Sequence, residues 1–309
     1  MIVLKSGVPK LRIDELAFSP DGAMIAAPGE VTGVCLWTAP TDNPKAELLK
    51  VPIRGVSLLA FAPNGTLYAG SDELCAISIT DRTSPRIADR FAITPWSSLW
   101  FGASPDGSRL VVATRERGQE SNRIRAWAAG EFRDPLWEVV IPGDVIWTRP
   151  LFTLDGESFV MCELYRDATR RWRPYQVVRS TATGEELDRS PSLAETPEQT
   201  VRSPDGQTLA CRVRGTISIY PMLSATPDAV IKNDGTRYYT GMAWHPTGKY
   251  LAATSNDETV KLYDATTWKH LRTFTWDIGR MRSVCFSPDG TLAAAGSDRG
   301  KVVVWDVDV

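Results

Sequence analysis

The sequence predicts an all-β fold in which one short antiparallel sheet recurs seven times around a closed ring. The last segment, Ser283 to Val309, contains three strand-like runs joined by tight turns. The turn between the first two runs recurs at intervals of 43, 42, 49, 50, 42 and 42 residues. A sheet this small cannot bury its faces alone, so the units must pack against each other. A period of about 40–45 residues with four strands per unit predicts a seven-bladed β-propeller over residues 1–309, as one domain.

The recurring turn has the residue types that a tight turn requires. In Ser287-Pro288-Asp289-Gly290, proline fixes φ at the second position and glycine adopts the left-handed conformation that closes the turn. The other copies are Ser19-Pro20-Asp21-Gly22, Ala62-Pro63-Asn64-Gly65, Ser104-Pro105-Asp106-Gly107, Thr153-Leu154-Asp155-Gly156, Ser203-Pro204-Asp205-Gly206 and His245-Pro246-Thr247-Gly248. We interpret the aspartates as structural, and His245 as a surface substitution.

The strands can be assigned in chain order. Ile2–Lys5 has no partner before the first unit, and the last unit ends after its third strand. We expect this N-terminal strand to complete the last blade as its outer edge, which removes an open sheet edge. The predicted inner strands include Leu16–Phe18, Leu58–Phe61 and Val284–Phe286, and the apolar second strands Met24–Ala27, Leu110–Ala113 and Leu292–Ala295. The predicted outer strands are Glu47–Val51, Arg86–Ile93, Leu136–Ile141, Glu186–Ser192, Ala229–Lys232 and Leu271–Trp276.

Two neighbouring units are longer than the others. Unit three inserts Thr114–Asn122 and unit four inserts Leu164–Pro174 between the second and third strands. We expect both insertions to extend one sector of the face that also carries the links between blades. Insertions grouped on one face often mark the binding face of a repeat protein.

Composition limits the possible partners and the compartment. The 35 basic and 37 acidic residues give a net charge of −2, which provides no general electrostatic attraction to nucleic acid or membrane. The five cysteines are scattered through predicted strands, which is typical of buried thiols in a reducing compartment. The N-terminal apolar run is too short for a signal peptide, and no apolar run reaches about 18 residues. We therefore expect a cytoplasmic monomer.

The units resemble WD repeats, a family of seven-bladed β-propellers. The Trp-Asp pair itself stands at Trp305-Asp306. Weaker versions of the motif are Leu36-Trp37-Thr38, Ala126-Trp127-Ala128 and Leu262-Tyr263-Asp264. The shared repeat position indicates that Trp37, Trp127, Tyr263 and Trp305 are packing residues.

One departure from the family is clear. WD repeats usually have a Gly-His pair whose histidine joins a buried network, whereas this chain has only His245 and His270 and no Gly-His pair. We therefore expect apolar packing and turn geometry to hold the blades. The alternative of a TolB-like propeller, which has similar turns, remains open as a more distant resemblance. The WD resemblance implies that positions around the central opening hold peptides or protein loops.

Two groups of residues are candidates for partner binding. The first combines arginine and aromatic residues, which are enriched at binding hot spots. It contains Arg115, Arg117, Tyr165, Arg166, Arg170, Arg171, Trp172 and Arg173. The alternative is a solvated hairpin whose arginines are neutralised by Glu116, Glu120, Glu163 and Asp167.

The second group lies in the links that enter the inner strands, on the same predicted face. Its members are Arg12, Arg149, Tyr238, Arg280 and Arg282. Arg280 and Arg282 are two apart before a strand and should point the same way. Trp96 and Trp147 are in equivalent links, and we interpret both as core residues.

Enzyme signatures are missing from the sequence. It has no G-x-S-x-G, H-E-x-x-H or C-x-x-C motif and no glycine-rich phosphate loop, so we expect no catalytic residue, metal or cofactor. We predict a non-catalytic scaffold that binds an acidic peptide or protein loop on the face carrying the insertions. The alternatives are a nucleic-acid-binding propeller that uses the same arginine and aromatic residues, and an enzyme or small-ligand sensor with a site in the central channel.

Overall fold

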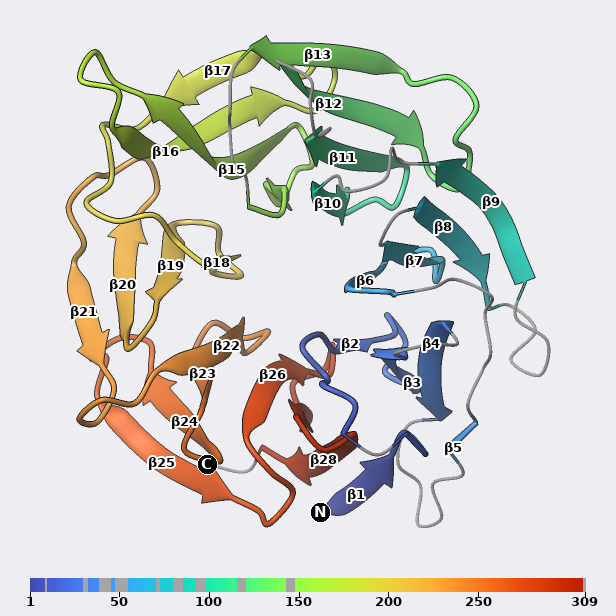
Figure 1. Cartoon of the computed structure of the whole chain (residues 1–309), viewed down its shortest axis with the longest axis vertical. Helices are drawn as coiled ribbons and strands as arrows, with labels where there is room; N and C mark the ends of the chain where they lie inside the picture. The colour runs from blue at the N-terminus through green and yellow to red at the C-terminus, as the bar shows by residue number, and fades with distance from the viewer. Residues whose placement is uncertain are drawn as a thin grey trace.

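The computed structural model describes residues 1–8, 10–29, 33–38, 46–47, 55–70, 73–79, 86–92, 98–115, 121–142 and 148–307. Within these ranges the chain forms seven sheets, each of four antiparallel strands, arranged as a ring (Figure 1). The first strand of each blade lies nearest the centre of the ring and the last lies at the periphery (Figure 1). The prediction of an all-β, seven-bladed propeller is confirmed.

Blades one to four follow the chain in order. Blade one consists of β2 (Ala17–Phe18), β3 (Met24–Gly29), β4 (Gly33–Thr38) and β5 (Ala46–Glu47). Blade two consists of β6 (Leu58–Phe61), β7 (Leu67–Gly70), β8 (Glu73–Ser78) and β9 (Arg86–Ala92). Blade three consists of β10 (Ser98–Ala103), β11 (Arg109–Arg115), β12 (Ser121–Ala128) and β13 (Trp137–Pro142). Blade four consists of β14 (Leu151–Phe152), β15 (Ser158–Arg166), β16 (Trp172–Ser180) and β17 (Glu186–Arg189).

Blades five to seven complete the ring. Blade five consists of β18 (Gln199–Arg202), β19 (Thr208–Val213), β20 (Thr216–Pro221) and β21 (Ala229–Lys232). Blade six consists of β22 (Tyr239–Trp244), β23 (Tyr250–Ser255), β24 (Thr259–Asp264) and β25 (His270–Thr275). Blade seven consists of β26 (Met281–Phe286), β27 (Leu292–Ser297), β28 (Lys301–Asp306) and, from the other end of the chain, β1 (Ile2–Lys5).

The two ends of the described chain close the ring. Strand β1, drawn in dark blue, pairs antiparallel with the red strand β28, from Ile2 opposite Val304 to Lys5 opposite Lys301 (Figure 1). The Ser6 amide donates to the Gly300 carbonyl at 2.9 Å and extends this pairing by one bond. The N-terminal strand is therefore the outer edge of blade seven, as predicted.

The recurring turn is stabilised by a short side-chain network. In blade one, the Ser19 hydroxyl donates to Asp21 at 2.6 Å and accepts the Met24 amide at 2.8 Å. Asp21 also accepts the Ala23 amide at 3.0 Å. The hydroxyl-to-aspartate bond recurs in blades three, four, five and seven. These aspartates hold the turns together, which confirms their structural interpretation.

The core lies between neighbouring blades. All residues of β3 are buried, and the second strands of other blades follow the same pattern. Small residues such as Ala26 and Ala294 let the sheets approach closely, while Trp37 and Trp127 fill the wider spaces farther out. Trp305 and Tyr263 are also buried, so all four residues at this repeat position are packing residues, as predicted.

His245 is buried, and its interpretation as a surface substitution is wrong. Its side chain is only 7% exposed and packs edge-on against Tyr250 and Phe286. Nδ1 hydrogen-bonds the Thr247 hydroxyl at 2.7 Å, and Nε2 lies 3.0 Å from the Gly290 carbonyl oxygen in blade seven. The imidazole of His245 therefore joins the turns of blades six and seven.

The two faces of the ring carry different connections. The recurring turns lie on one face, which we call the turn face. The opposite face, which we call the link face, carries the turns between second and third strands and the links between blades. The insertion of unit four is on the link face, but most of it is strand, because β15 and β16 stay paired up to Arg166 opposite Trp172. We call residues 162–176 the blade-four ribbon.

Candidate functional site

A cavity of about 950 Å³ opens on the link face and is lined by residues of blades five, six and seven and of the link into blade one. Arginine dominates its lining. The arginines are Arg12, Arg212, Arg214, Arg237, Arg280 and Arg282. They meet here because each lies in a link, in a turn or near the end of a strand at this face. Tyr238 adds an exposed aromatic ring, and the acidic lining residues are Glu198 and Asp298.

Only part of this positive charge is balanced within the protein. Arg212 pairs with Glu198 at 2.6 Å, while Arg12 and Arg282 share Asp14 at 3.3 and 2.7 Å. The side chains of the remaining lining arginines have neither an ion-pair nor a hydrogen-bond partner among the residues that the structure describes. These are Arg214, Arg237 and Arg280. The cavity therefore brings together three guanidinium groups that have no partner among the described residues.

Arg212 lies deeper than the other arginines. Burial lowers the pKa of its guanidinium, the nearby positive charge of Arg282 lowers it further, and Glu198 opposes the shift. Its Nη1 also donates to the Tyr239 carbonyl at 2.9 Å. Arg212 therefore supports the cavity wall between blades five and six.

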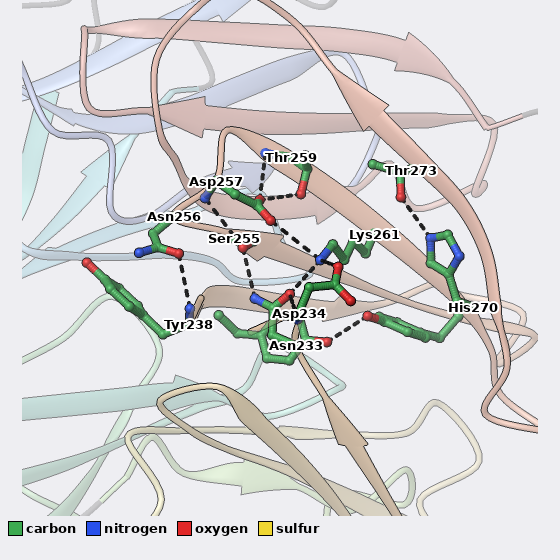
Figure 2. Close-up of polar contacts among 12 residues, drawn as sticks. Asn233, Asp234, Tyr238, Ser255, Asn256, Asp257, Thr259, Lys261, His270 and Thr273 are labelled. Carbon is green, nitrogen blue, oxygen red and sulfur yellow. Dashed lines mark hydrogen bonds and ion pairs between the residues drawn. The ribbon is translucent and has the colours of Figure 1, made fainter. Parts of the chain in front are cut away.

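A polar network in blade six lies beside the cavity (Figure 2). The side chain of Lys261 is 7% exposed, and its ammonium donates to Asn233 at 2.5 Å and to Asp234 at 2.7 Å. It also lies 3.5 Å from the carboxylate of Asp257. Asn233 in turn donates to the Ser255 hydroxyl at 2.9 Å. The expectation that apolar packing and turn geometry alone hold the blades is therefore wrong for blade six, which has a polar network built without histidine.

The structure brings four of the predicted binding residues together. Arg12, Tyr238, Arg280 and Arg282 all line the cavity, although Arg12 is distant from the other three in sequence. Arg280 and Arg282 line the same cavity, although a strand irregularity falls between Met281 and Ser283.

Arg149 is placed differently. Its guanidinium donates to Glu15 at 2.9 Å and lies 3.4 Å from the Leu59 carbonyl, so it connects blade four with blades one and two. Burial raises the pKa of Glu15, and Arg149 opposes that shift. This pair joins opposite parts of the ring, which gives Arg149 an intramolecular partner.

The arginines and aromatic residues of the blade-four ribbon contact each other. Arg166 stacks over Trp172 at 4.8 Å, and Arg173 donates to Asp167 at 2.9 Å. The Tyr165 hydroxyl donates to Glu163, which is fully buried and paired with Arg179 at 2.7 Å. Arg170 and Arg171 are exposed at the tip of the ribbon. Arg115 ends β11, whereas Arg117, Trp96 and Trp147 lie outside the described residues.

Three cavity arginines were not predicted from the sequence. Arg212 lies near the end of β19, Arg214 lies in the short turn that follows it, and Arg237 precedes Tyr238 in the next link. The link position of Arg237 was a usable signal, since Tyr238 was selected on that ground. Arg212 and Arg214 lie at a two-residue turn in a repeat unit of normal length, so neither an insertion nor a link position marked them as candidates.

The described residues also limit other kinds of site. They contain no group of three or more His, Cys, Asp or Glu side chains placed to hold a metal ion. Nor does this part of the chain include a helix of the length and apolarity needed to cross a membrane.

Comparison with known proteins agrees with the fold. Residues 233–264 and 268–306, which cover blade six and most of blade seven, match the family model described as WD domain, G-beta repeat. The protein is a seven-bladed β-propeller with WD repeats in its last two blades. The β-propeller domain of Myceliophteria thermophila Cps50 (Swd1) superposes on it with a TM-score of 0.76, covering 99% of this chain and 100% of that chain. At 13% identity, that likeness shows the fold alone.

The curated relatives of this propeller are distant. Serine-threonine kinase receptor-associated protein of Homo sapiens is 27% identical over 106 residues, which is 34% of this chain and 30% of that protein. Meiotic recombination protein rec14 of Schizosaccharomyces pombe is 26% identical over 192 residues, or 60% of each chain. The matched regions thus span 30% and 60% of the length of these two relatives.

Proposed function

We propose that the protein is a non-catalytic interaction scaffold that binds an acidic peptide or protein loop in the link-face cavity. The observation that carries this proposal is the convergence of six arginines on one cavity, three of them without a partner among the described residues. Guanidinium groups form strong, directional hydrogen bonds with carboxylates and other oxyanions. An acidic segment would supply the partners that these arginines lack.

The ring favours this function for a second reason. The cavity residues come from strand ends and from turns and links that paired strands hold in place, so binding would cost little additional conformational entropy. Tyr238 offers an exposed aromatic surface beside the arginines, and this combination is enriched at binding hot spots. A relative named as receptor-associated also supports a protein partner.

The cavity is a better candidate than the blade-four ribbon. In the ribbon, Arg166 stacks on Trp172 and Arg173 is paired with Asp167. The ribbon therefore resembles the solvated hairpin that was the alternative interpretation. Both features lie on the link face, so the predicted face is retained and the proposed binding position moves toward the centre of the ring.

The direct test is a titration of a fluorescein-labelled oligoglutamate peptide followed by fluorescence anisotropy. We expect the wild type to bind this peptide and not an oligoglutamine control. The Arg280→Glu variant should bind about tenfold more weakly, because it replaces an attractive charge by a repulsive one. Equal binding of the two peptides would overturn the proposal. Tighter binding of an oligothymidine probe would assign the cavity to nucleic acid.

A further inference from the structure

The turn of blade five and the link that enters blade six form one unit at the cavity wall. The Asn233 amide donates to the Gly215 carbonyl at 2.8 Å, and the Tyr239 amide donates to the Arg214 carbonyl at 2.8 Å. A Cβ at Gly215 would lie 2.7 Å from the Arg237 carbonyl oxygen, so this close approach requires glycine. The backbones of Arg214 and Arg237 are therefore adjacent, and both side chains line the cavity.

Arg214 has an unfavourable backbone conformation. Its φ is +48°, in the left-handed region that glycine and asparagine occupy at much lower cost than arginine. The close approach of the link explains the glycine at position 215, but it does not explain the arginine before it. A strained residue beside a cavity favours a role for its side chain there.

The link that carries Arg237 is fixed at both ends (Figure 2). At its start, Lys261 binds the side chains of Asn233 and Asp234. At its end, the Tyr238 amide donates to the Asn256 side chain at 3.0 Å, and the Asn256 amide donates to the Tyr238 carbonyl at 3.1 Å. The position of Arg237 is therefore restricted before any ligand arrives, which favours binding.

We propose that Arg214 and Arg237 act together as the arginine pair that recognises an anionic group of the bound segment. This inference rests on the proposed function and names the residues that determine its specificity. The two side chains are exposed, have no ion-pair partner among the described residues and extend from adjacent backbones into one cavity. Arg214 retains its strained backbone because its side chain contributes to recognition.

The test uses a substitution with opposite expected effects on stability and binding. Arg214→Gly removes the strain, so its thermal midpoint should rise by about 2 °C. The same substitution removes one guanidinium, so the affinity for the oligoglutamate peptide should fall about tenfold. Arg214→Lys retains the charge and the strain, and should lose less affinity than Arg214→Gly at an unchanged thermal midpoint.

The chain offers a matched control in the equivalent turn of blade six. Glu258 has a φ of +70° and does not line the cavity. Glu258→Gly should raise the thermal midpoint similarly, with peptide affinity within about twofold of the wild type.

The possible outcomes separate the two proposals. If Arg214→Gly keeps the affinity of the wild type while Arg280→Glu loses it, the arginine pair is wrong and the proposed function survives. If Glu258→Gly is stabilised and Arg214→Gly is not, the argument from strain is wrong. A wild type that does not bind the acidic peptide would overturn both proposals.

Discussion

The two histidines of the chain have opposite environments. His245 is buried between blades six and seven and contacts the Gly290 carbonyl. His270 is exposed on β25, and among the described residues its ring hydrogen-bonds Thr273, within its own strand. The same residue type therefore has a structural role between blades at one position and a local role at the other.

This contrast predicts different effects of substitution. His245→Ala should lower the free energy of unfolding by about 2–3 kcal/mol, because it leaves a small cavity and a buried carbonyl without its partner. His270→Ala should change it by no more than about 0.5 kcal/mol. Urea unfolding of both variants measures the difference. Similar losses in the two variants would contradict the interpretation of His245.

Sequence reasoning succeeded for residues whose role repeats with the blades. Trp37, Trp127 and Trp305 were identified as core because they share one position of the repeat, and all are buried. It failed for His245 because the burial of this ring depends on the neighbouring blade. A Cβ at Gly290 would lie only 2.6 Å from the His245 ring, so the glycine leaves room for histidine to reach the next turn.

At the scale of the element, the recurring turn carries a charge that should make stability depend on pH. Hydrogen bonds from Ser104 and Ser108 lower the pKa of Asp106 to about 2. The pKa of Asp289 is lowered for the same reason, chiefly by Ser287. Because the folded pKa lies below the unfolded value, these carboxylates stabilise the fold above about pH 4 and lose that contribution as the pH falls toward 2.

The triple variant Asp106→Asn, Asp205→Asn and Asp289→Asn tests this dependence. The urea midpoint of the wild type should fall between pH 4 and pH 2, and that of the variant should fall less steeply, because three of the titrating groups are gone. Parallel curves for the two proteins would show that other groups control acid stability.

The blade-four insertion shows how far strands can be predicted from sequence. Its position and face follow from the repeat, but its strand character does not, since Arg170, Arg171 and Arg173 give no apolar alternation. Cross-strand pairing from Glu163 opposite Tyr175 to Arg166 opposite Trp172 continues the sheet instead. Pairing with an existing strand therefore outweighs the weak local preference of this segment.

At the scale of the whole molecule, β1 closes the ring, so the stability of the propeller should be sensitive to substitutions in this strand. Leu4 is 2% exposed and belongs to the core shared with Ile13, Val302 and Val304. Val3, its neighbour in the same strand, is 37% exposed. The strand therefore provides a buried position and an exposed position for the same substitution.

Leu4→Asp should destabilise the protein by about 3–4 kcal/mol, because it removes core packing and buries a charge. It should also cause self-association, because β28 becomes an open sheet edge. Val3→Asp should have nearly the stability of the wild type and should remain monomeric. Urea unfolding and size-exclusion chromatography test these expectations, and a monomeric Leu4→Asp of normal stability would contradict closure by β1.

The cavity is the feature that the sequence predicted least completely. Arg12 lies near the start of the chain, whereas Arg214, Arg237 and Arg280 lie in three later blades, and only ring closure brings them together. Arg12 and Arg280 were identified from the sequence because both lie in links that precede inner strands. Arg214 was missed because it lies in a turn within a blade, and no sequence pattern shows that the side chains of this turn face the centre of the ring.

The central claim is that the link-face cavity, and not the blade-four ribbon, binds an acidic segment. Two charge-reversal variants measured with the oligoglutamate peptide test it most directly: Arg237→Glu with Arg280→Glu in the cavity, and Arg170→Glu with Arg171→Glu at the ribbon tip. We expect the cavity variant to bind at least about tenfold more weakly than the wild type, and the ribbon variant to stay within about twofold. Loss of binding in the ribbon variant alone would contradict the claim.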